Sequence, residues 1–275
     1  MIKALRRSDG FVRIFLTVIV AFVICALLAP VLAPFEPDSQ NIRARLLPPL
    51  SSGHLLGTDH LGRDILSRIL FGARVSLKIG MLSVALASVI GVTFGLMAGF
   101  LGRRFDDAIS WLVNVQLAIP FILLAISVVA VLGPSETNLI IVLALGSWAS
   151  YARVIRAKTL SLKGREHIEA ARSLGAGSLR IMFKHLVPNM VSAIVVLSSF
   201  EFAKTVIAEA ALSFLGLSPS SPRYSSWGIM LAEGKDYLAA GWWAATMPGL
   251  TIMLLVLAIN VVGDWSRDRF DPRSA

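Results

Sequence analysis

Charge and cysteine are both scarce in this 275-residue sequence. Charged residues make up 16% of it, whereas 56% of the residues are hydrophobic. Soluble domains carry about 25% charged residues, so the composition excludes a water-soluble globular protein. The only cysteine, Cys25, lies inside an apolar run. It excludes a disulfide within the chain and a cysteine-based metal cluster, and we expect it to be a small packing residue.

The motifs of nucleotide-hydrolysing and other hydrolytic enzymes are also absent. The sequence contains no Gly-x4-Gly-Lys-Ser/Thr phosphate loop, and the nearest candidate, Glu233–Asp236, lacks the first glycine and the hydroxyl residue. It has neither a Gly-x-Ser-x-Gly elbow nor a His-Glu-x-x-His helix. We therefore expect a non-catalytic chain that is driven by another subunit or by an ion gradient.

What the sequence does contain is apolar runs long enough to cross a bilayer. A spanning helix needs about 20 predominantly apolar residues, and backbone groups in lipid must be paired internally, which favours helices. The pattern predicts an all-α polytopic membrane bundle of about six transmembrane helices. The six runs are residues 14–33, 77–101, 108–132, 138–157, 189–215 and 242–263.

The first run has two interpretations, a secretory signal or an uncleaved helix. Its cationic flank resembles that of a signal peptide, but the run is long for a signal, and Pro30 and Pro34 crowd the cleavage site. We therefore predict an uncleaved first helix. The preceding cations are Lys3, Arg6, Arg7 and Arg13.

The net charge of +9 and the pI of about 10.3 do not lead to a nucleic-acid partner. The cations lie between apolar runs, as in a protein surrounded by membrane lipid. With the N-terminus in the cytoplasm, 17 of the 26 lysines and arginines fall in cytoplasmic segments and eight fall outside, with Lys204 inside a run. The distribution predicts that both termini are cytoplasmic.

The longest polar insert on the predicted cytoplasmic side is a helical hairpin at residues 161–188. Its first helix is expected at residues 165–174, ended by Gly175, and Ser178 is the expected N-cap of the second. In that second helix Leu179, Met182, Phe183 and Leu186 form one apolar stripe at helical spacing. Such a stripe fits either an interfacial helix on lipid or a helix that docks into a groove of a partner.

Five sequence motifs resemble those of one transporter family. Glu169-Ala170-Ala171 followed by Gly175 and Pro188 is similar to the EAA loop of ABC importer permeases, although His185 and Val187 replace the usual Ile and Leu. The other motifs resemble the C-type permease subunit of dipeptide, oligopeptide and nickel importers. They are 57–64 with 65–68, Leu212–Leu217, Ser226-Trp227-Gly228, and the tail from Gly263-Asp264 to Asp271-Pro272-Arg273.

The resemblance implies a type I ABC importer permease fold in a bacterial inner membrane. It implies an N-terminal part at 1–60, with the cytoplasmic tail, first span and outer loop, and a five-helix core at 61–275. The implied partners are a second homologous permease, two ATPase subunits that bind ATP and Mg, and an extracytoplasmic solute-binding protein, with no cofactor in this chain. Glu169, Ala170, Ala171 and Gly175 would contact the ATPase, and the solute would be a peptide, with nickel or glutathione-like solutes as alternatives.

A self-sufficient ion-coupled secondary transporter is the rival from another class. Such folds usually contain internal repeats, and the two halves of this sequence show no persuasive repeat. A third interpretation, a membrane scaffold, predicts no uptake defect on deletion.

The second run contains small residues at four-residue intervals. Ala87, Gly91, Gly95 and Gly99 would let another helix approach closely. The spacing fits packing within the chain and contact with a second permease equally well.

The fifth run contains three ionisable residues, Glu201, Lys204 and Glu209. Such groups at membrane depth usually face a bundle interior or an aqueous path. One interpretation is an i,i+3 ion pair between Glu201 and Lys204. The other is a solute path lined by Glu201, Lys204, Thr205 and Glu209.

The Gly57–Asp64 motif is interpreted first as a turn that leads into an amphipathic helix. It offers two favourable i,i+4 pairs, Asp59 with Arg63 and Asp64 with Arg68. A brace or gate on the outer face is the functional alternative. The histidines in this loop, His54 and His60, make a poor metal-ligand set, and we expect them to be ordinary loop residues.

Overall fold

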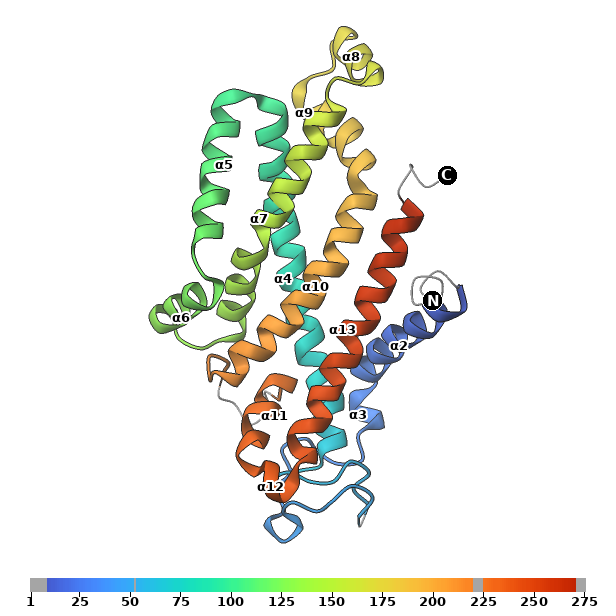
Figure 1. Ribbon diagram of the computed structural model, residues 1–275, viewed down its shortest axis with the longest axis vertical. Helices are drawn as coiled ribbons and strands as arrows, with labels where there is room; N and C mark the ends of the chain where they lie inside the picture. The colour runs from blue at the N-terminus through green and yellow to red at the C-terminus, as the bar shows by residue number, and fades with distance from the viewer. Residues whose placement is uncertain (1–8, 52, 220–224, 271–275) are drawn as a thin grey trace.

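The computed structural model describes residues 9–51, 53–219 and 225–270 of the chain. All named regular elements in these ranges are helices (Figure 1), which confirms the predicted all-α class. Three cations of the expected N-terminal tail, Lys3, Arg6 and Arg7, lie outside these ranges, as does the 271–273 part of the tail motif.

Within the described ranges, five helical stretches are long and apolar enough to cross a membrane, or six if one bent pair counts as a single span. This count confirms the prediction of about six. The five are α2 (Asp9–Leu27), α4 (Ile65–Leu101), α7 (Glu136–Leu162), the stretch Ser178–Phe214 that contains α10 (Val191–Phe214), and α13 (Trp243–Phe270).

The bent pair replaces the single span expected at 108–132. Helices α5 (Arg103–Ala118) and α6 (Phe121–Leu132) meet at 89°. Between them Ile119 has extended backbone angles and Pro120 precedes α6. A proline disfavours helical geometry at the residue before it and cannot donate a backbone hydrogen bond, so the apolar run breaks there.

Helices α4, α7, α10 and α13 run along the longest axis, whereas α2 lies obliquely beside them (Figure 1). One end, here called the hairpin end, carries α8 (Glu166–Ser173). The opposite loop end carries residues 33–51 and 53–64 with α11 (Trp227–Gly234) and α12 (Leu238–Gly241). The short α3 (Ala29–Leu32) connects α2 to that loop.

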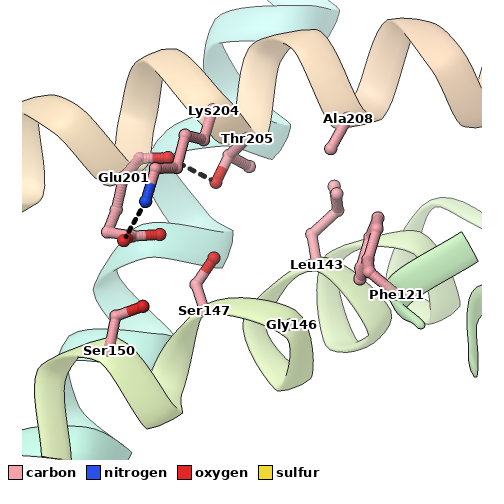
Figure 2. A pocket seen from close by; sticks show the side chains of 9 residues that line it. All are labelled: Phe121, Leu143, Gly146, Ser147, Ser150, Glu201, Lys204, Thr205 and Ala208. Atoms are coloured by element: carbon pink, nitrogen blue, oxygen red, sulfur yellow. Dashed lines mark hydrogen bonds and ion pairs between the residues drawn. The ribbon is translucent and has the colours of Figure 1, made fainter. Parts of the chain in front are cut away.

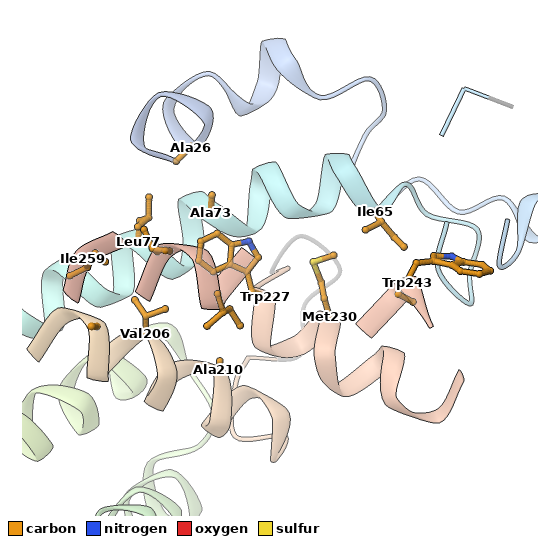
Figure 3. Packing of buried hydrophobic residues seen from close by; sticks show 14 residues of the cluster. Ala26, Ile65, Ala73, Leu77, Val206, Ala210, Trp227, Met230, Trp243 and Ile259 are labelled. Atoms are coloured by element: carbon orange, nitrogen blue, oxygen red, sulfur yellow. The ribbon is translucent and has the colours of Figure 1, made fainter. Parts of the chain in front are cut away.

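A hydrophobic core joins α2, α4, α10, α11 and α13 around Trp227 (Figure 3). The Trp227 side chain is fully buried, and its Nε1 donates a hydrogen bond to the Ile69 carbonyl at 3.0 Å. Next to it, a Cβ on Gly228 would lie 2.6 Å from the Ala210 Cα. The Ser226-Trp227-Gly228 motif is therefore the point where α11 packs into the bundle.

Helix α4 begins twelve residues before the predicted second run and has 37 residues. At 1.5 Å per residue it is about 55 Å long, longer than the ~30 Å hydrocarbon layer. Its first turns carry three cations, which lower the apolar content of this part of the sequence. The search for apolar runs therefore placed the start of the helix too late. These are Arg68, Arg74 and Lys78.

The small residues of α4 pack against α7 within the chain. A Cβ on Gly95 would lie 2.6 Å from the Ala152 carbonyl oxygen and 2.8 Å from the Ile155 Cβ. Gly91 and Gly99 are equally close to α7, and Ala87 is fully buried. Of the two alternatives for this stripe, intrachain packing is confirmed and a second permease on this face is excluded.

The Gly57–Asp64 motif forms a buried ionic network. Asp59 accepts from Arg63 Nε at 2.6 Å, as predicted. The predicted pair of Asp64 with Arg68 is wrong, because Arg68 NH1 also reaches Asp59 at 2.6 Å. Asp64 instead caps α4, accepting from the Ser67 backbone N–H at 2.7 Å. A carboxylate at the N-cap accepts a hydrogen bond from an otherwise unpaired helix N–H group. The i,i+4 spacing therefore predicted the wrong partner for Asp64.

The same network ties the loop to α11. Glu233 accepts from Arg63 NH2 at 2.6 Å and from Arg68 NH2 at 2.8 Å. Burial raises the pKa of Asp59, but Arg68, Arg63 and two backbone N–H groups outweigh it and hold that pKa below 3.8. The motif therefore stabilises the loop end as a brace, and this contribution is lost only as the pH falls through that lowered pKa.

We predict that Gly95→Ala destabilises the protein by about 1–3 kcal/mol, because the new methyl group forces α4 and α7 apart. The matched control is Gly249→Ala, where the Cβ meets only Leu231 at 3.5 Å. The control should be neutral or stabilising, because alanine favours a helix. Thermal unfolding in detergent measures both, and equal midpoints would contradict the packing.

We predict that Asp59→Asn destabilises the loop end by about 3 kcal/mol, because two buried arginines lose their shared carboxylate. Hydrogen exchange of residues 33–64 measures the effect. Glu36→Gln removes an exposed carboxylate from the same loop and should leave exchange unchanged. An equal increase in both variants would mean that the network does not hold the loop.

Candidate functional site

The hairpin at residues 161–188 is built as two short helical pieces at the end of the bundle (Figure 1). The first, α8, ends in a Schellman motif. The Ala176 N–H donates to the Ala171 carbonyl at 3.0 Å and the Gly175 N–H to the Arg172 carbonyl at 2.9 Å. Gly175 has φ +82°, which is the left-handed conformation that glycine adopts readily. The predicted helix stop is confirmed.

The second piece differs from the regular helix that was expected. Its N-cap is Gly177 with no side-chain hydrogen bond, so the predicted cap at Ser178 is wrong. The chain passes through α9 (Ser178–Arg180), a π turn (Ile181–Leu186) and a 3-10 turn (Val187–Met190) before α10. Pro188 cannot donate to the Lys184 carbonyl, so a regular α-helical ladder cannot continue through this point.

The π turn divides the predicted apolar stripe between two surfaces. Met182 and Leu186 are buried against the ends of α4 and α7, together with Ile181. Leu179 and Phe183 remain 69% and 60% exposed. The stripe is therefore not one continuous face. One half anchors the hairpin to the bundle and the other half is mostly exposed.

The exposed part of the hairpin is an apolar tip formed by Leu174, Leu179 and Phe183. Leu174 is 88% exposed, and the sequence interpretation missed it. Its position directly before the helix-stopping Gly175 was the available signal, because the last residue before such a stop projects from the end of the helix. Glu169, Ala170 and Gly175 are also exposed, and Ala171 is half-buried. Three large apolar side chains within ten residues of the hairpin are thus exposed, and exposed apolar surface of this kind is typical of an interaction site.

A second candidate site is a pocket of about 210 Å³ between α7 and α10, closed at one side by α6 (Figure 2). Its polar part contains Ser147 and Ser150 from α7, and its apolar part contains Phe121 and Leu143. The predicted path residues Glu201, Lys204 and Thr205 line it from α10. The serines were missed, although Gly146–Ser150 is a small and polar segment within an apolar run.

Glu201 and Lys204 form the predicted ion pair, with Lys204 Nζ 3.0 Å from Glu201 Oε1. The pair is unequal, because the Glu201 side chain is 3% exposed and the Lys204 side chain 69%. Thr205 donates to the backbone carbonyl of Glu201 at 2.7 Å. The ion pair and the pocket lining are thus properties of the same residues, and the two interpretations do not exclude each other.

Glu209 does not line this pocket. It is fully buried and accepts hydrogen bonds from Ser213 at 2.8 Å and Ser76 at 3.1 Å. Ser226 donates to Ser213 at 3.3 Å. The carboxyl group of Glu209 therefore joins α10 to α4 through hydroxyl groups. Its helical spacing to Glu201 did not reveal that a neighbouring helix encloses it.

The two loop histidines lie in different surroundings. His54 Nδ1 is 2.9 Å from Asp64 Oδ1. His60 lies with Asp59 and Glu233, whose potential ligand atoms are all within 4.8 Å of one another. Arg63 and Arg68 already neutralise both of these carboxylates. The geometry matches ordinary loop residues better than a cation site.

Comparison with solved structures shows the fold. The chain matches a structure described as inward-facing conformations of the MetNI methionine ABC transporter, with TM-score 0.59 and 21% identity, over 73% of this chain and 95% of that one. It also matches the crystal structure of an amino acid ABC transporter with histidines, with TM-score 0.58 and 18% identity, over 74% and 95%. The type I ABC importer permease fold is confirmed.

Comparison with curated proteins gives closer relatives. The chain is 44% identical to the di/tripeptide transport system permease protein DppC of Pseudomonas aeruginosa, over 91% of this chain and 84% of that protein. It is 39% identical to the dipeptide transport system permease protein DppC of Haemophilus influenzae, over 98% and 92%. It is 41% identical to the glutathione transport system permease protein GsiD of Pectobacterium atrosepticum, over 93% and 84%.

Two family models match the sequence. The N-terminal TM domain of oligopeptide transport permease C matches residues 3–49, which agrees with a first run that is a membrane helix. The other model matches residues 91–275, which include the hairpin and the pocket. The chain belongs to the family described as binding-protein-dependent transport system inner membrane component.

Proposed function

We propose that this chain is the permease subunit of an ATP-driven importer of dipeptides or oligopeptides. The relatives named for dipeptide and tripeptide transport support this solute class. A relative named for glutathione, itself a small peptide, supports the same class more than it supports nickel. The fold and the family make a self-sufficient secondary transporter the weaker alternative.

The exposure of the apolar tip is the main support for a role in coupling ATP hydrolysis to transport. The tip belongs to the hairpin at the α8 end of the bundle (Figure 1), and Leu174, Leu179 and Phe183 are each at least 60% exposed. A helical hairpin with exposed apolar side chains fits a groove in a partner protein. The partner of this surface is an ATPase subunit, and Glu169, Ala170, Ala171 and Gly175 belong to the same contact.

The complete importer contains a second homologous permease, two ATPase subunits that bind ATP and Mg, and an extracytoplasmic solute-binding protein. Exposed apolar residues on α5 and α6, such as Trp111 at 66% and Leu123 at 57%, offer surface to the second permease or to lipid. The chain lies in a bacterial inner membrane, with the hairpin end and both termini on the cytoplasmic side. This orientation follows the distribution of lysine and arginine.

Movement of the hairpin drives alternating access. The buried half of the second piece, Met182 and Leu186, packs on α4 and α7, and the chain continues from it into α10. A displacement of the tip therefore reaches the helix that carries Glu201, Lys204 and Thr205. These residues line part of the solute path. This chain performs no bond chemistry, and hydrolysis takes place on its partners.

We predict that Leu179→Asp weakens binding of the ATPase subunits roughly thirtyfold, as loss of a buried interface anchor does. Copurification of the ATPase with the permease pair measures the effect. The matched control is Leu55→Asp, an equally large change at a 57% exposed leucine of the loop end. If the hairpin lay only on lipid, both variants would copurify the ATPase like the native chain.

We predict that Gly175→Val uncouples hydrolysis from import. A β-branched residue at φ +82° is strained by about 1–2 kcal/mol, so the tip changes direction. Gly177→Val is the matched control, because Gly177 has φ −67° and also faces open space. The ratio of peptide imported to ATP hydrolysed in proteoliposomes should fall for Gly175→Val alone. Equal ratios in both variants would remove the coupling role of this turn.

A further inference from the structure

We propose that the pocket between α7 and α10 is a binding station for zwitterionic solutes, in which Glu201 takes the solute's ammonium group and Lys204 its carboxylate. The inference rests on the proposed function, since it requires that solute reaches this pocket. It goes further in assigning the charges that recognise the solute. Without solute, Glu201 and Lys204 pair with each other. When solute binds, this ion pair separates, and each residue pairs with the oppositely charged end of the solute.

The unequal burial of the pair is the first observation. Glu201 is 3% exposed and its carboxylate has Lys204 as its ionic partner, through Oε1 alone. In the described chain no hydrogen bond or ion pair uses Oε2. A buried carboxylate is strongly disfavoured without a cation, so Glu201 requires one whenever Lys204 moves away. An ammonium group in the pocket meets that requirement.

The Lys204 side chain can move away from Glu201. Its side chain is 69% exposed, and the flexible lysine stem can place its ammonium group at several positions. When a solute carboxylate pairs with Lys204, one internal ion pair is replaced by two pairs with the solute. The pocket remains electrically neutral throughout, which matters because an unpaired charge at membrane depth is costly.

The opposite wall supplies groups for the middle of a peptide. Ser147 and Ser150 project from α7 toward Glu201 and Lys204 (Figure 2). Neither hydroxyl group takes part in a hydrogen bond with another described residue. A hydroxyl group both donates and accepts, so the two serines can bind the N–H and C=O groups of a peptide bond.

The size and the apolar end of the pocket restrict the solute further. The volume is about 210 Å³, many times the roughly 10–15 Å³ that one water needs on this measure. An extended dipeptide spans about 7 Å. Phe121, Leu143 and Ala208 lie at the end away from Ser150 (Figure 2), where a small apolar side chain can pack. The station therefore suits short peptides with free termini.

The test is import by the complete complex in proteoliposomes, with Ala-Ala, its C-terminal amide and its N-acetyl derivative as solutes. Each rate is normalised to the occupancy of the binding protein and then to the native complex, so selection by the binding protein cancels. Lys204→Met should lower the ratio of Ala-Ala to the amide about tenfold, the effect of losing one charge-assisted bond. Glu201→Gln should lower the ratio of Ala-Ala to the N-acetyl derivative by a similar factor.

The chain offers a matched control in a second Lys–Glu pair. Lys78 and Glu136 are 2.7 Å apart on the surface, and neither lines the pocket. Lys78→Met and Glu136→Gln should leave all ratios unchanged. Lys204→Arg keeps the positive charge and should keep the native ratio. An equal loss for all three solutes in Lys204→Met and Glu201→Gln, or no change, would overturn the station.

A labelling experiment covers the case in which Lys204→Met fails to assemble. Ser147→Cys in a Cys25→Ser background places the single thiol in the pocket. Saturating Ala-Ala with its binding protein should slow the reaction of this thiol with a methanethiosulfonate reagent at least threefold in the complex during ATP turnover. Unchanged labelling would overturn the station. Absence of any ATP-dependent import by the native complex would overturn the proposed function instead.

Discussion

The close contact between α4 and α7 is the constraint on which the rest of the structure depends. Carbonyl groups of α7 lie against glycines of α4, notably at Gly95 and Gly99. In a membrane, where apolar surface gains little by leaving lipid, such backbone proximity is a main source of helix association. Because α7 is fixed in this way, one part of it forms a wall of the pocket and its end carries the hairpin.

The hairpin is held by the same pair of helices. Ile181 and Met182 are buried in one cluster with Leu96 of α4 and Ile155 of α7, directly at the Gly95 contact. Lys163 Nζ also donates to the Gly99 carbonyl at 3.0 Å. The α4–α7 pair therefore supports the buried half of the hairpin. The Asp59 network plays the corresponding part at the loop end, where it joins α4 to α11.

The sequence predicts what depends on local chemistry. Apolar length predicts the spans, and a glycine before a polar turn predicts the stop at Gly175. Which of several possible residues a side chain pairs with depends on the folded structure and not on the local sequence. Arg68 could pair with Asp64 or Asp59, and only the folded loop decides in favour of Asp59. Likewise, helical spacing places Glu201 and Glu209 on one face of the same helix. It contains no information about α4, whose Ser76 donates a hydrogen bond to Glu209. The division of the stripe at Leu179 and Met182 depends on a π turn; Pro188 indicates that the regular helix is interrupted, but not which side chains are then buried.

The continuity of the hairpin with α10 explains why two such different surfaces occur in one segment. A single path of chain runs from the exposed tip through the π turn to Lys204, with the buried Met190 at its midpoint. A regular helix along this path would transmit displacement but would turn Leu179 and Met182 to the same face. The π turn changes the register instead, so Leu179 is exposed while Met182 packs against the bundle. The irregularity at Pro188 thus places exposed and buried side chains on one short segment, directly before the helix that carries the Glu201–Lys204 pair.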